Sequence, residues 1–396
     1  GDRFMTPLPS TLRPWALPLL TTLLFGCGGG SSDSTTPTPT TQVQLQFSAP
    51  AEADNVQTLG VGIPVAVGVT VNGATAADGT SVVWSAANAS FSPARSSSTG
   101  GQASSTMVAT AGGMLQVQAS ATVSGQTSSA TKTLYLRPAP QALEVLVPAY
   151  FNPNPSGSPW DQLISTAQAY PGVQVTAIMN PNDGIFSSAD EQFARVVSDF
   201  TGEGGQVVAY VATGYGTGRS VSAVKQNIDN YLRFYGRNQL SGFFLDEMGA
   251  TSQHLAFYKE IYSYIKGLDE ELRVIGNPGT LPVADYADVA DVLVTFEGKA
   301  SDYTRFNPQD GNAWVYAKPN AAQAMLVHNA TSCAAMQTAM RAAATARNNT
   351  GLVYATDLLY DFATNTGNPW ANLPSYWTSL LGTVSALNRG TALPGC

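Results

Sequence analysis

Charged residues are scarce in this chain, and histidine and cysteine are scarcer still. Only 12% of the 396 residues are Asp, Glu, Lys or Arg, about half of the share that soluble proteins usually have. The 19 basic residues are outnumbered by 27 acidic ones, which gives a net charge of −8. Binding to nucleic acid requires basic patches, so this balance argues against nucleic acid as a partner. It is compatible with a neutral or cationic ligand.

The chain has two histidines, His254 and His328, and three cysteines, Cys27, Cys333 and Cys396. A zinc site built from these residues would use nearly all of them, at no recognisable spacing. A Ser-His-Asp triad or a Cys-His pair would need one of the two histidines, and the first lies where a helix is expected to start. If the chain is an enzyme, its carboxylates are the favoured catalytic groups, and no metal or cofactor is required.

The first 27 residues have the pattern of an export signal. Arg13 precedes an apolar run over 15–25, which is too short to span a bilayer but suits the core of a signal peptide. Residues 24–27 (LFGC) resemble the lipobox of bacterial lipoproteins, in which the cysteine is acylated after cleavage. A plain secretory signal is the alternative. We therefore expect a protein of the bacterial cell envelope, anchored through Cys27 at the outer membrane or cell surface, or a secreted one.

Residues 28–42 form a Gly, Ser, Thr and Pro tract that cannot bury a core and is expected to act as a tether. In an oxidising compartment, Cys333 and Cys396 are a potential disulfide pair that would attach the C-terminus to the body of the protein. The sequence alone leaves this pairing open. Nothing in it indicates an oligomer, so a monomer is expected.

Residues 43–137 have the pattern of a small all-β region. Short runs alternate between apolar and polar residues with a period of two, separated by Gly, Asn or Asp turn signals. These runs are 43–49, 64–71, 80–86, 104–110, 114–121 and 131–137. About seven strands in about 100 residues predict a β-sandwich. Segments 77–86 and 105–121 resemble bacterial Ig-like domains of the invasin type, and a spacer role is favoured because no polar cluster suggests a site.

Beyond the Pro-Ala-Pro sequence at 138–140, apolar β-rich runs alternate with stretches of helical spacing. The β-rich runs start at 143, 173, 206, 242, 273, 291, 324 and 351, and the clearest helical stretches are 222–237, 254–268 and 332–347. Strands that are apolar on both faces and alternate with helices indicate parallel βαβ units. Eight such units over 141–390 predict an α/β fold of the (β/α)8 barrel type, with only a turn at 281–288 between the fifth and sixth strands. An open doubly wound sheet is the competitor, but no glycine-rich nucleotide fingerprint follows the first strand.

In such barrels the active site lies at the carboxyl ends of the strands. Nearly every predicted strand ends there in a polar or aromatic residue: Tyr150, Asn180, Tyr215, Asp246, Glu247, Asn277, Glu297, Asn329 and Asp357. We predict a substrate-binding role for Tyr150, Asn180, Tyr215, Asn277 and Asp357. Rim aromatics that could stack on sugar rings are Tyr150, Tyr215, Trp314, Tyr360 and Trp370, although each could equally be a packing residue.

Hydrolysis of a glycosidic bond needs two carboxyl groups across the scissile oxygen, and Asp246 or Glu247 with Glu297 could supply them. Adjacent strand residues point to opposite faces, so Asp246 and Glu247 are expected to have different tasks. Two structural alternatives remain open. The adjacent acids could cap the following helix, although that helix is expected to start only near residue 252. Glu297 could instead form an ion pair with Lys299.

Five stretches of the barrel region stand out: LVPAYFNP (146–153), the segment 159–184 that ends in NPNDG, VVAYVATGYGTGRS (207–220), IDNYLRFY (228–235) and GFFLDE (242–247). Together they resemble the spherulin-4 proteins, or spherulation-specific family 4. The resemblance extends from about 143 to 388 and is strongest between 145 and 250. It implies a (β/α)8 fold and endo-acting hydrolysis of α-1,4-linked N-acetylgalactosamine or galactosamine polymers.

Carried over by position, the acids of the family fall on Asp246, Glu247 and Glu297. We assign Asp246 as nucleophile, Glu297 as general acid/base and Glu247 as a supporting carboxylate. This retaining mechanism requires carboxyl groups about 5–5.5 Å apart, whereas about 6.5–9.5 Å would indicate inversion. The expected partner is a polysaccharide. The alternative is a non-catalytic, surface-anchored protein that binds carbohydrate or acts as an adhesin.

Overall fold

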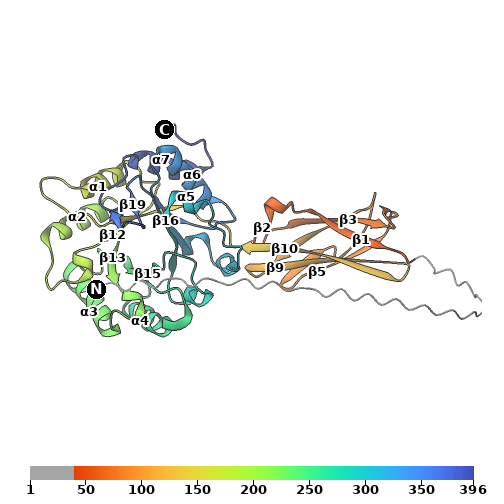
Figure 1. The fold of residues 1–396 in the computed structure, drawn as a ribbon, viewed down its shortest axis with the longest axis horizontal. Helices are drawn as coiled ribbons and strands as arrows, with labels where there is room; N and C mark the ends of the chain where they lie inside the picture. Colours follow the sequence, from red (N-terminus) through yellow and green to blue (C-terminus); the bar gives the residue numbers. More distant parts are fainter. Residues whose placement is uncertain (1–39) are drawn as a thin grey trace, which may run out of the picture. The chain divides into compact units, whose positions relative to one another are not determined.

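The computed structural model describes residues 40–396, which fold into a β-sandwich followed by a closed barrel (Figure 1). The predicted export signal, its Cys27 and nearly all of the tether lie outside the described residues. Within the described part of the chain, no helix has both the length and the apolar character that membrane crossing requires.

Ten strands form the N-terminal region. They are β1 Val43–Ala49, β2 Val56–Thr58, β3 Ile63–Val71, β4 Ala74–Thr75, β5 Ser81–Ser85, β6 Ala89–Ser92, β7 Arg95–Ser97, β8 Gln102–Ala109, β9 Gly113–Val123 and β10 Gln126–Arg137. One sheet has the order β1-β3-β8-β6 with β4 paired to β3, and the other has the order β2-β10-β9-β5-β7. All six predicted strands are present.

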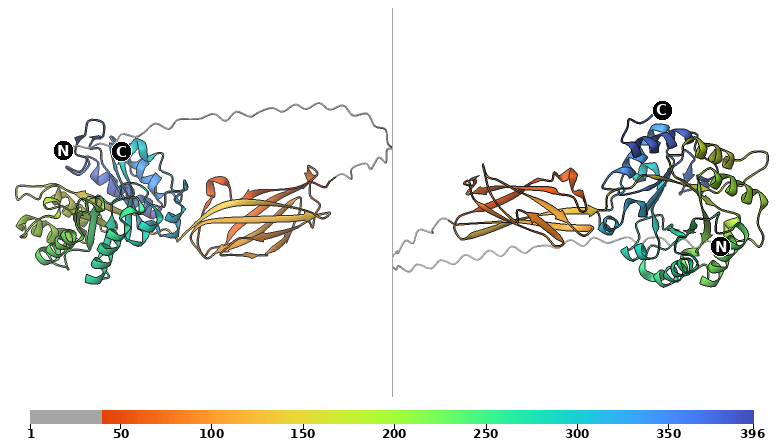
Figure 2. Two further views of the ribbon diagram at one scale, coloured as in Figure 1. Left: turned by 60° about the horizontal axis from the view of Figure 1, so that its bottom comes forward. Right: turned by 180° about the vertical axis from the view of Figure 1, so that it is seen from behind.

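The two sheets of this region enclose one hydrophobic core, and their layers are visible in Figure 2. The period-two pattern explains this arrangement, because alternate residues of a strand face opposite sides. On β3, Ile63, Val65, Val67 and Val69 are all buried and belong to the same hydrophobic cluster as Trp84 of the opposite sheet. The segment thus has two β-sheets on either side of a shared core.

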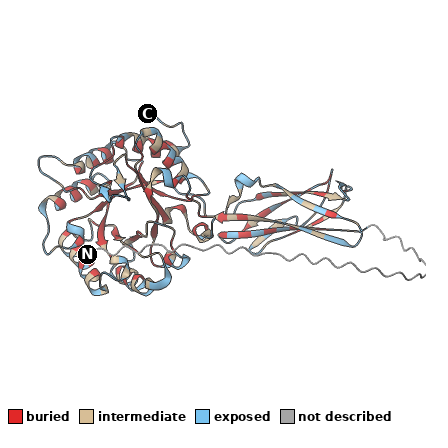
Figure 3. Ribbon diagram, viewed as in Figure 1, coloured by how far each residue is buried: buried red, intermediate tan, exposed pale blue. Residues whose placement is uncertain are grey.

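Eight parallel strands close the barrel in chain order, and the open-sheet alternative is excluded. They are β11 Glu144–Ala149, β12 Val175–Met179, β13 Gln206–Ala212, β14 Gly242–Asp246, β15 Arg273–Gly276, β16 Val292–Lys299, β17 Gln323–His328 and β18 Leu352–Ala355. Each overlaps a strand that the sequence predicts. In Figure 3 the barrel strands are mostly buried, and helices with exposed outer faces surround them. Between β15 and β16 there is only a short 3-10 helix, Ala284–Asp288, as expected.

The helices are α1 Pro159–Ala169, α2 Glu191–Gly202, α3 Val221–Tyr235, α4 Leu255–Leu268, α5 Ala300–Tyr303, α6 Cys333–Ala344 and α7 Trp377–Arg389. Side-chain caps fix the starts of three of them. Asp190 accepts hydrogen bonds from two backbone N–H groups of α2, and the hydroxyls of Ser220 and Ser332 each accept one from the first turn of α3 and α6. Such caps supply partners for backbone donors that a helix leaves unpaired.

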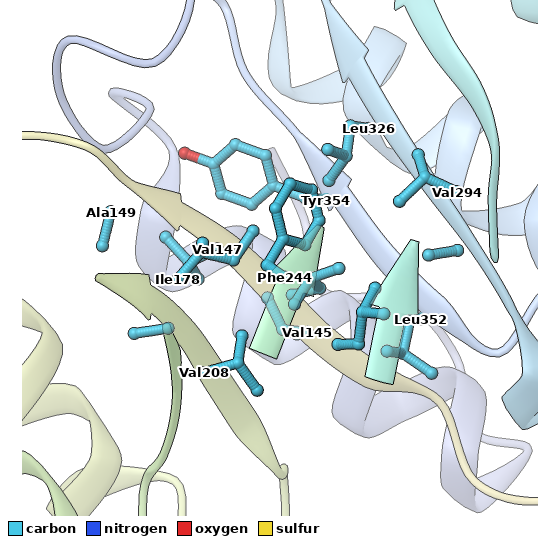
Figure 4. Packing of buried hydrophobic residues seen from close by; sticks show 14 of the residues in the cluster. Val145, Val147, Ala149, Ile178, Val208, Phe244, Val294, Leu326, Leu352 and Tyr354 are labelled. Carbon is cyan, nitrogen blue, oxygen red and sulfur yellow. The ribbon is translucent and has the colours of Figure 1, made fainter. Parts of the chain in front are cut away.

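The barrel core is apolar on both sides of the strands. Figure 4 shows side chains of the barrel strands packed together, among them Val147, Val208, Phe244 and Leu352, all of which are buried. Burial of a Val, Leu or Phe side chain contributes about 1.5–3 kcal/mol each, so this core supplies most of the driving force for the barrel.

A charged cluster lies at the start of the strands. The Arg273 guanidinium on β15 donates to both carboxylate oxygens of Glu144 on β11, at 2.8 and 2.7 Å, and to Thr176 Oγ1 on β12 at 3.1 Å. Thr176 also donates to Glu144. Because β11 and β15 are four places apart in a ring of eight, this ion pair crosses the barrel interior at its N-terminal end.

A disulfide joins Cys333, at the start of α6, to Cys396, so the pairing left open by the sequence is present. It closes a loop with a sequence separation of 63 residues. Loss of chain entropy in the unfolded state would make such a loop worth about 4 kcal/mol. The bond attaches the segment after α7 to the body of the barrel.

Candidate active site

Asp246 is the last residue of β14, and its carboxylate accepts two hydrogen bonds. Tyr210 Oη on β13 donates to Oδ2 at 2.6 Å, and Asn277 Nδ2, just after β15, donates to Oδ1 at 2.8 Å. Burial raises the pKa of Tyr210, and the charge of Asp246 raises it further. The phenol therefore stays protonated and acts as a donor. Both bonds hold the carboxylate in one orientation at the mouth of the barrel.

Glu297 lies on β16, two strands away in the ring. Its Oε2 accepts a hydrogen bond of 2.6 Å from the same Asn277 Nδ2. Burial raises its pKa from 4.5 to about 7, the charge of Asp246 adds to the rise, and Asn277 and the indole of Trp370 oppose it. The residue keeps some exposure while its carboxyl group lies deep in the site. At neutral pH a substantial fraction of Glu297 is therefore protonated.

One amide nitrogen thus connects the two acids. Because Asn277 Nδ2 is 2.8 Å from Asp246 Oδ1 and 2.6 Å from Glu297 Oε2, these two oxygens are at most about 5.4 Å apart. Such a close approach of the nearest oxygens is compatible with the carboxyl separation of about 5–5.5 Å typical of retaining glycosidases.

Glu247 follows the strand in a left-handed backbone conformation, with φ of 52°. Such a conformation is unfavourable for a non-glycine residue, and neighbouring donors stabilise it here. Its carbonyl accepts from Tyr215 N at 2.7 Å, Thr213 Oγ1 at 2.9 Å and Tyr258 Oη at 3.2 Å, while its Oε2 accepts from Gly214 N at 3.1 Å.

This turn corrects an expectation from the sequence. Strand alternation would point Asp246 and Glu247 to opposite faces, but β14 ends at Asp246, and both acids line one cavity. Their contacts still differ, since Asp246 bonds to Tyr210 and Asn277 whereas Glu247 bonds to the loop after β13.

The cavity at the barrel mouth has a volume of about 430 Å³, within the range of about 300–1,000 Å³ usual for ligand pockets. It is lined by Tyr215, Asp246, Glu247, Asn277, Pro278, Gly279, Glu297 and Phe362. Among residues 40–396, no salt bridge includes any of the three acids. Within the described residues, the carboxyl groups of the cavity thus face a ligand without a cationic side chain paired to them.

Both structural alternatives for the acids are excluded within the described chain. The helix α4 starts at Leu255 with His254 as its N-cap, so neither Asp246 nor Glu247 caps it. Glu297 forms no salt bridge with Lys299 there. Over the same residues, no group of three or more His, Cys, Asp or Glu side chains is arranged to hold a metal ion.

The structure brings together some of the residues predicted to bind substrate. Tyr215 and Asn277 line the cavity. Tyr150 packs edge-on against Tyr210, with ring centroids 5.4 Å apart. Its pKa is raised well above the usual value, first by burial and then by the charges of Asp246 and Glu297.

Three of the five predicted residues, Tyr150, Asn180 and Asp357, are not among those that line the cavity. Asn180 donates to Asp183 Oδ1 at 3.3 Å. Asp357 accepts hydrogen bonds from the backbone N–H of Ser375 at 3.1 Å and from its hydroxyl at 2.5 Å, so it fixes the segment that leads into α7. A polar residue that follows a strand thus lies at the rim of the barrel, but its side chain does not always point into the cavity.

The aromatic residues predicted for the rim also differ in whether they lie near the acids. Trp314 lies in a 3-10 helix, Ala313–Ala317, and lines a different pocket with Asp291 and Gln323, which precede or begin strands. It is thus at the N-terminal end of the barrel and not at the rim. Trp370 is close enough to Glu297 to affect its pKa, and Tyr360 packs against His328.

Sequence reasoning missed Tyr210 and Phe362. Tyr210 lies inside an apolar run, where an aromatic residue usually indicates core packing, and only its place in the YVATGYG stretch marks it. Phe362 is on a loop with no periodicity, so no sequence pattern identified it.

Comparison with known proteins agrees with this fold. The family model for spherulation-specific family 4 matches residues 144–384, which is most of the barrel region and more than half of the chain. The chain belongs to spherulation-specific family 4. Spherulin-4 of Physarum polycephalum is 34% identical over 184 residues, which are 46% of this chain and 52% of that protein. The chain thus spans about half the length of this relative.

Among solved structures, Sph3 of Aspergillus clavatus, in complex with GalNAc, matches with a TM-score of 0.50 and 22% identity. The match covers 62% of this chain and 98% of that one. At this identity the likeness supports the family's barrel fold.

Proposed function

We propose that this family 4 chain is a glycoside hydrolase that cleaves α-1,4-linked N-acetylgalactosamine or galactosamine polymers with retention of configuration. The observation that carries the proposal is the pair of carboxyl groups bridged by Asn277 Nδ2. The bridge keeps the nearest oxygens of the two groups within about 5.4 Å of each other, which supports the closely spaced pair of a retaining enzyme over the wider spacing that inversion uses.

The environments of the two acids suggest their roles. Asp246 is held by Tyr210 and Asn277, so it is oriented to attack the anomeric carbon as nucleophile. Glu297 has a pKa raised to about 7 and can protonate the leaving oxygen, then take a proton from the water that releases the product. Glu247 supports the site from the next position, with its backbone fixed by the loop after β13.

The choice of sugar rests on family membership and on the character of the cavity. The acidic lining accepts neutral or cationic rings, and the exposed ring of Tyr215 offers a surface on which a sugar can pack. The similar barrel of Aspergillus clavatus Sph3 is described in complex with GalNAc. These features favour an amino-sugar polymer over an anionic one.

In the decisive experiment, the purified barrel fragment, residues 141–396, is incubated with a galactosamine-rich exopolysaccharide. Released oligosaccharides are detected by mass spectrometry. Asp246→Asn is the matched control, since the amide has the same shape but cannot act as a nucleophile. Oligomers from the wild type alone, with melting temperatures of the two proteins within a few degrees, support the proposal. Polysaccharide retained uncleaved by both proteins would favour the alternative of a carbohydrate-binding or adhesin protein.

We also propose that the enzyme acts as a monomer at the cell envelope, anchored through an acylated Cys27 and spaced from the membrane by the tether and an Ig-like sandwich. The disulfide between Cys333 and Cys396 supports export to an oxidising compartment. Metabolic labelling with a fatty acid tests the anchor. Label incorporated by the wild type and absent from Cys27→Ser is expected, and equal labelling of both would contradict it.

A further inference from the structure

A short hairpin rises from the end of the last barrel strand. Its strands are β19 Tyr360–Asp361 and β20 Thr366–Gly367, and every residue from 361 to 368 is exposed. Phe362 is 62% exposed, yet its side chain lines the cavity that contains Asp246, Glu247 and Glu297. Phe362 is thus a large aromatic residue on a polar tip that remains accessible to a ligand in the acidic cavity.

The base of the hairpin is attached to the neighbouring strand end. Asn329, just after β17, accepts a hydrogen bond from Tyr360 N at 2.9 Å, and its own N–H donates to Leu358 O at 3.0 Å. Asn329 adopts a left-handed φ of 56°, which lets it make both contacts. The hairpin therefore has a defined position over the barrel mouth.

The Phe362 ring packs against two neighbouring rings. It meets Tyr360 nearly at right angles, with centroids 4.7 Å apart and an interplanar angle of 89°, and its centroid is 5.8 Å from His328. His328 in turn packs against Trp370, which influences the Glu297 carboxyl. A supported ring loses little conformational freedom when a ligand covers it, and such preorganisation favours binding.

In the order of the barrel strands, one exposed aromatic residue lies on each side of the acids. Tyr215 follows β13 and is 60% exposed, while Phe362 follows β18. The acids follow or lie on β14 and β16, between these two positions. A chain of sugars that reaches the acids from the β18 side has to pass over Phe362.

We propose that Phe362 is a stacking platform for a pyranose ring of the substrate chain, at a subsite next to the cleaved bond on the β18 side. This inference rests on the proposed glycosidase function and adds a specificity-determining residue to it. A galacto-configured ring presents C–H groups on one face, and an aromatic ring covers such a face with a favourable loss of exposed apolar area. The subsite should therefore favour longer substrates.

The test compares Phe362→Ala with Leu359→Ala on α-1,4-linked N-acetylgalactosamine oligosaccharides of increasing length. Leu359 is 57% exposed beside the same hairpin but does not line the cavity, so it is the matched control. The measured quantity is the ratio of kcat/KM for the longest oligomer to that for the shortest. Dissociation constants are measured in parallel in the Asp246→Asn background, so that binding is tested apart from cleavage.

Phe362→Ala is expected to lower this ratio about tenfold and to weaken binding of the longest oligomer by a similar factor, as loss of one aromatic contact implies. Leu359→Ala should have the same ratio as the wild type. Phe362→Tyr, which keeps an aromatic ring, should also keep the wild-type ratio. An unchanged ratio and unchanged binding in Phe362→Ala overturn the platform while leaving the hydrolase intact. Equal losses in both alanine variants assign the effect to hairpin structure and also overturn it. Failure of the wild type to bind or cleave any oligomer removes the proposed function together with the platform.

Discussion

The two ends of the barrel hold their acids in opposite ways. At the N-terminal end, Glu144 has the Arg273 guanidinium on both of its oxygens. At the C-terminal end, Asp246, Glu247 and Glu297 share one cavity, and no salt bridge within residues 40–396 includes any of them. A paired carboxylate stabilises a fold or is neutral to it, whereas grouped carboxylates without cations are unfavourable and persist where chemistry needs them. The ion pair expected to stabilise the fold and the carboxyl groups proposed for catalysis thus lie at opposite ends of the barrel.

The largest expected effect is on catalysis at the C-terminal end. Glu297→Gln should lower kcat on the natural polymer by about 10²–10⁴-fold, because the amide cannot donate the proton that the leaving oxygen needs. A substrate with an activated leaving group, such as a nitrophenyl glycoside, should lose far less. The two rates are compared for wild type and variant. Equal losses on both substrates would remove Glu297 from the role of general acid.

The next effect is on stability at the N-terminal end. Arg273→Met should lower the free energy of unfolding by about 3 kcal/mol, because it leaves Glu144 partly buried without its cation. Arg305→Met is the matched control: Arg305 pairs with Asp302 but its side chain is 78% exposed, so a loss below about 1 kcal/mol is expected. Denaturant unfolding measures both. If the two variants lose equally little, the ion pair across the barrel contributes no more than a surface pair.

Most of the fold could be predicted, because it depends on periodicity. Apolar runs with helical stretches between them define eight parallel strands, and even the short connection at 281–288 was visible in the spacing. The site was predicted in part. Asp246, Glu247 and Glu297 follow apolar runs, and a closed barrel must bring such strand ends to one rim.

The remaining parts of the site depend on geometry that a linear pattern does not contain. The bridge from Asn277 to both acids requires the register between β14, β15 and β16. The left-handed φ of Glu247 overrides strand alternation, and the exposed Phe362 belongs to a hairpin without periodicity. For Asp357 the pattern predicted a role that its contacts do not support. The residue follows a strand, as a substrate-binding residue would, but its carboxylate bonds to Ser375.

A smaller effect links the acidic end to stability. The pKa of Glu297 is raised to about 7 in the folded protein from an ordinary value of 4.5. As pH rises from about 4.5, the unfolded state loses this proton first, so folding becomes less favourable until the pH passes 7. Glu297→Gln removes this penalty and should stabilise the protein by about 2 kcal/mol at pH 8, after allowance for partial exposure, and by nearly nothing at pH 4.

Unfolding at the two pH values checks this prediction. Glu203→Gln, at an exposed position after α2, is the control and should show no pH-dependent gain. A gain of the same size at pH 4 and pH 8 would mean that the Glu297 carboxyl ionises freely in the folded state. In that case burial in the acidic cavity would not disfavour the charged form of Glu297, although its contacts include no cation.

The smallest effect concerns the bridge between the acids. The hydrogen bond from Asn277 lowers the pKa of Glu297 against the larger effect of burial. Asn277→Ala should therefore raise that pKa further, by less than about one unit, since a single hydrogen bond to a charged group is worth about 1.5–3 kcal/mol at most and solvent can replace part of it. The basic limb of the kcat/KM profile should move to higher pH, while kcat falls because the two carboxyl groups lose their common donor. A lower kcat with an unshifted pH profile would show that Asn277 holds the spacing of the acids without affecting their protonation.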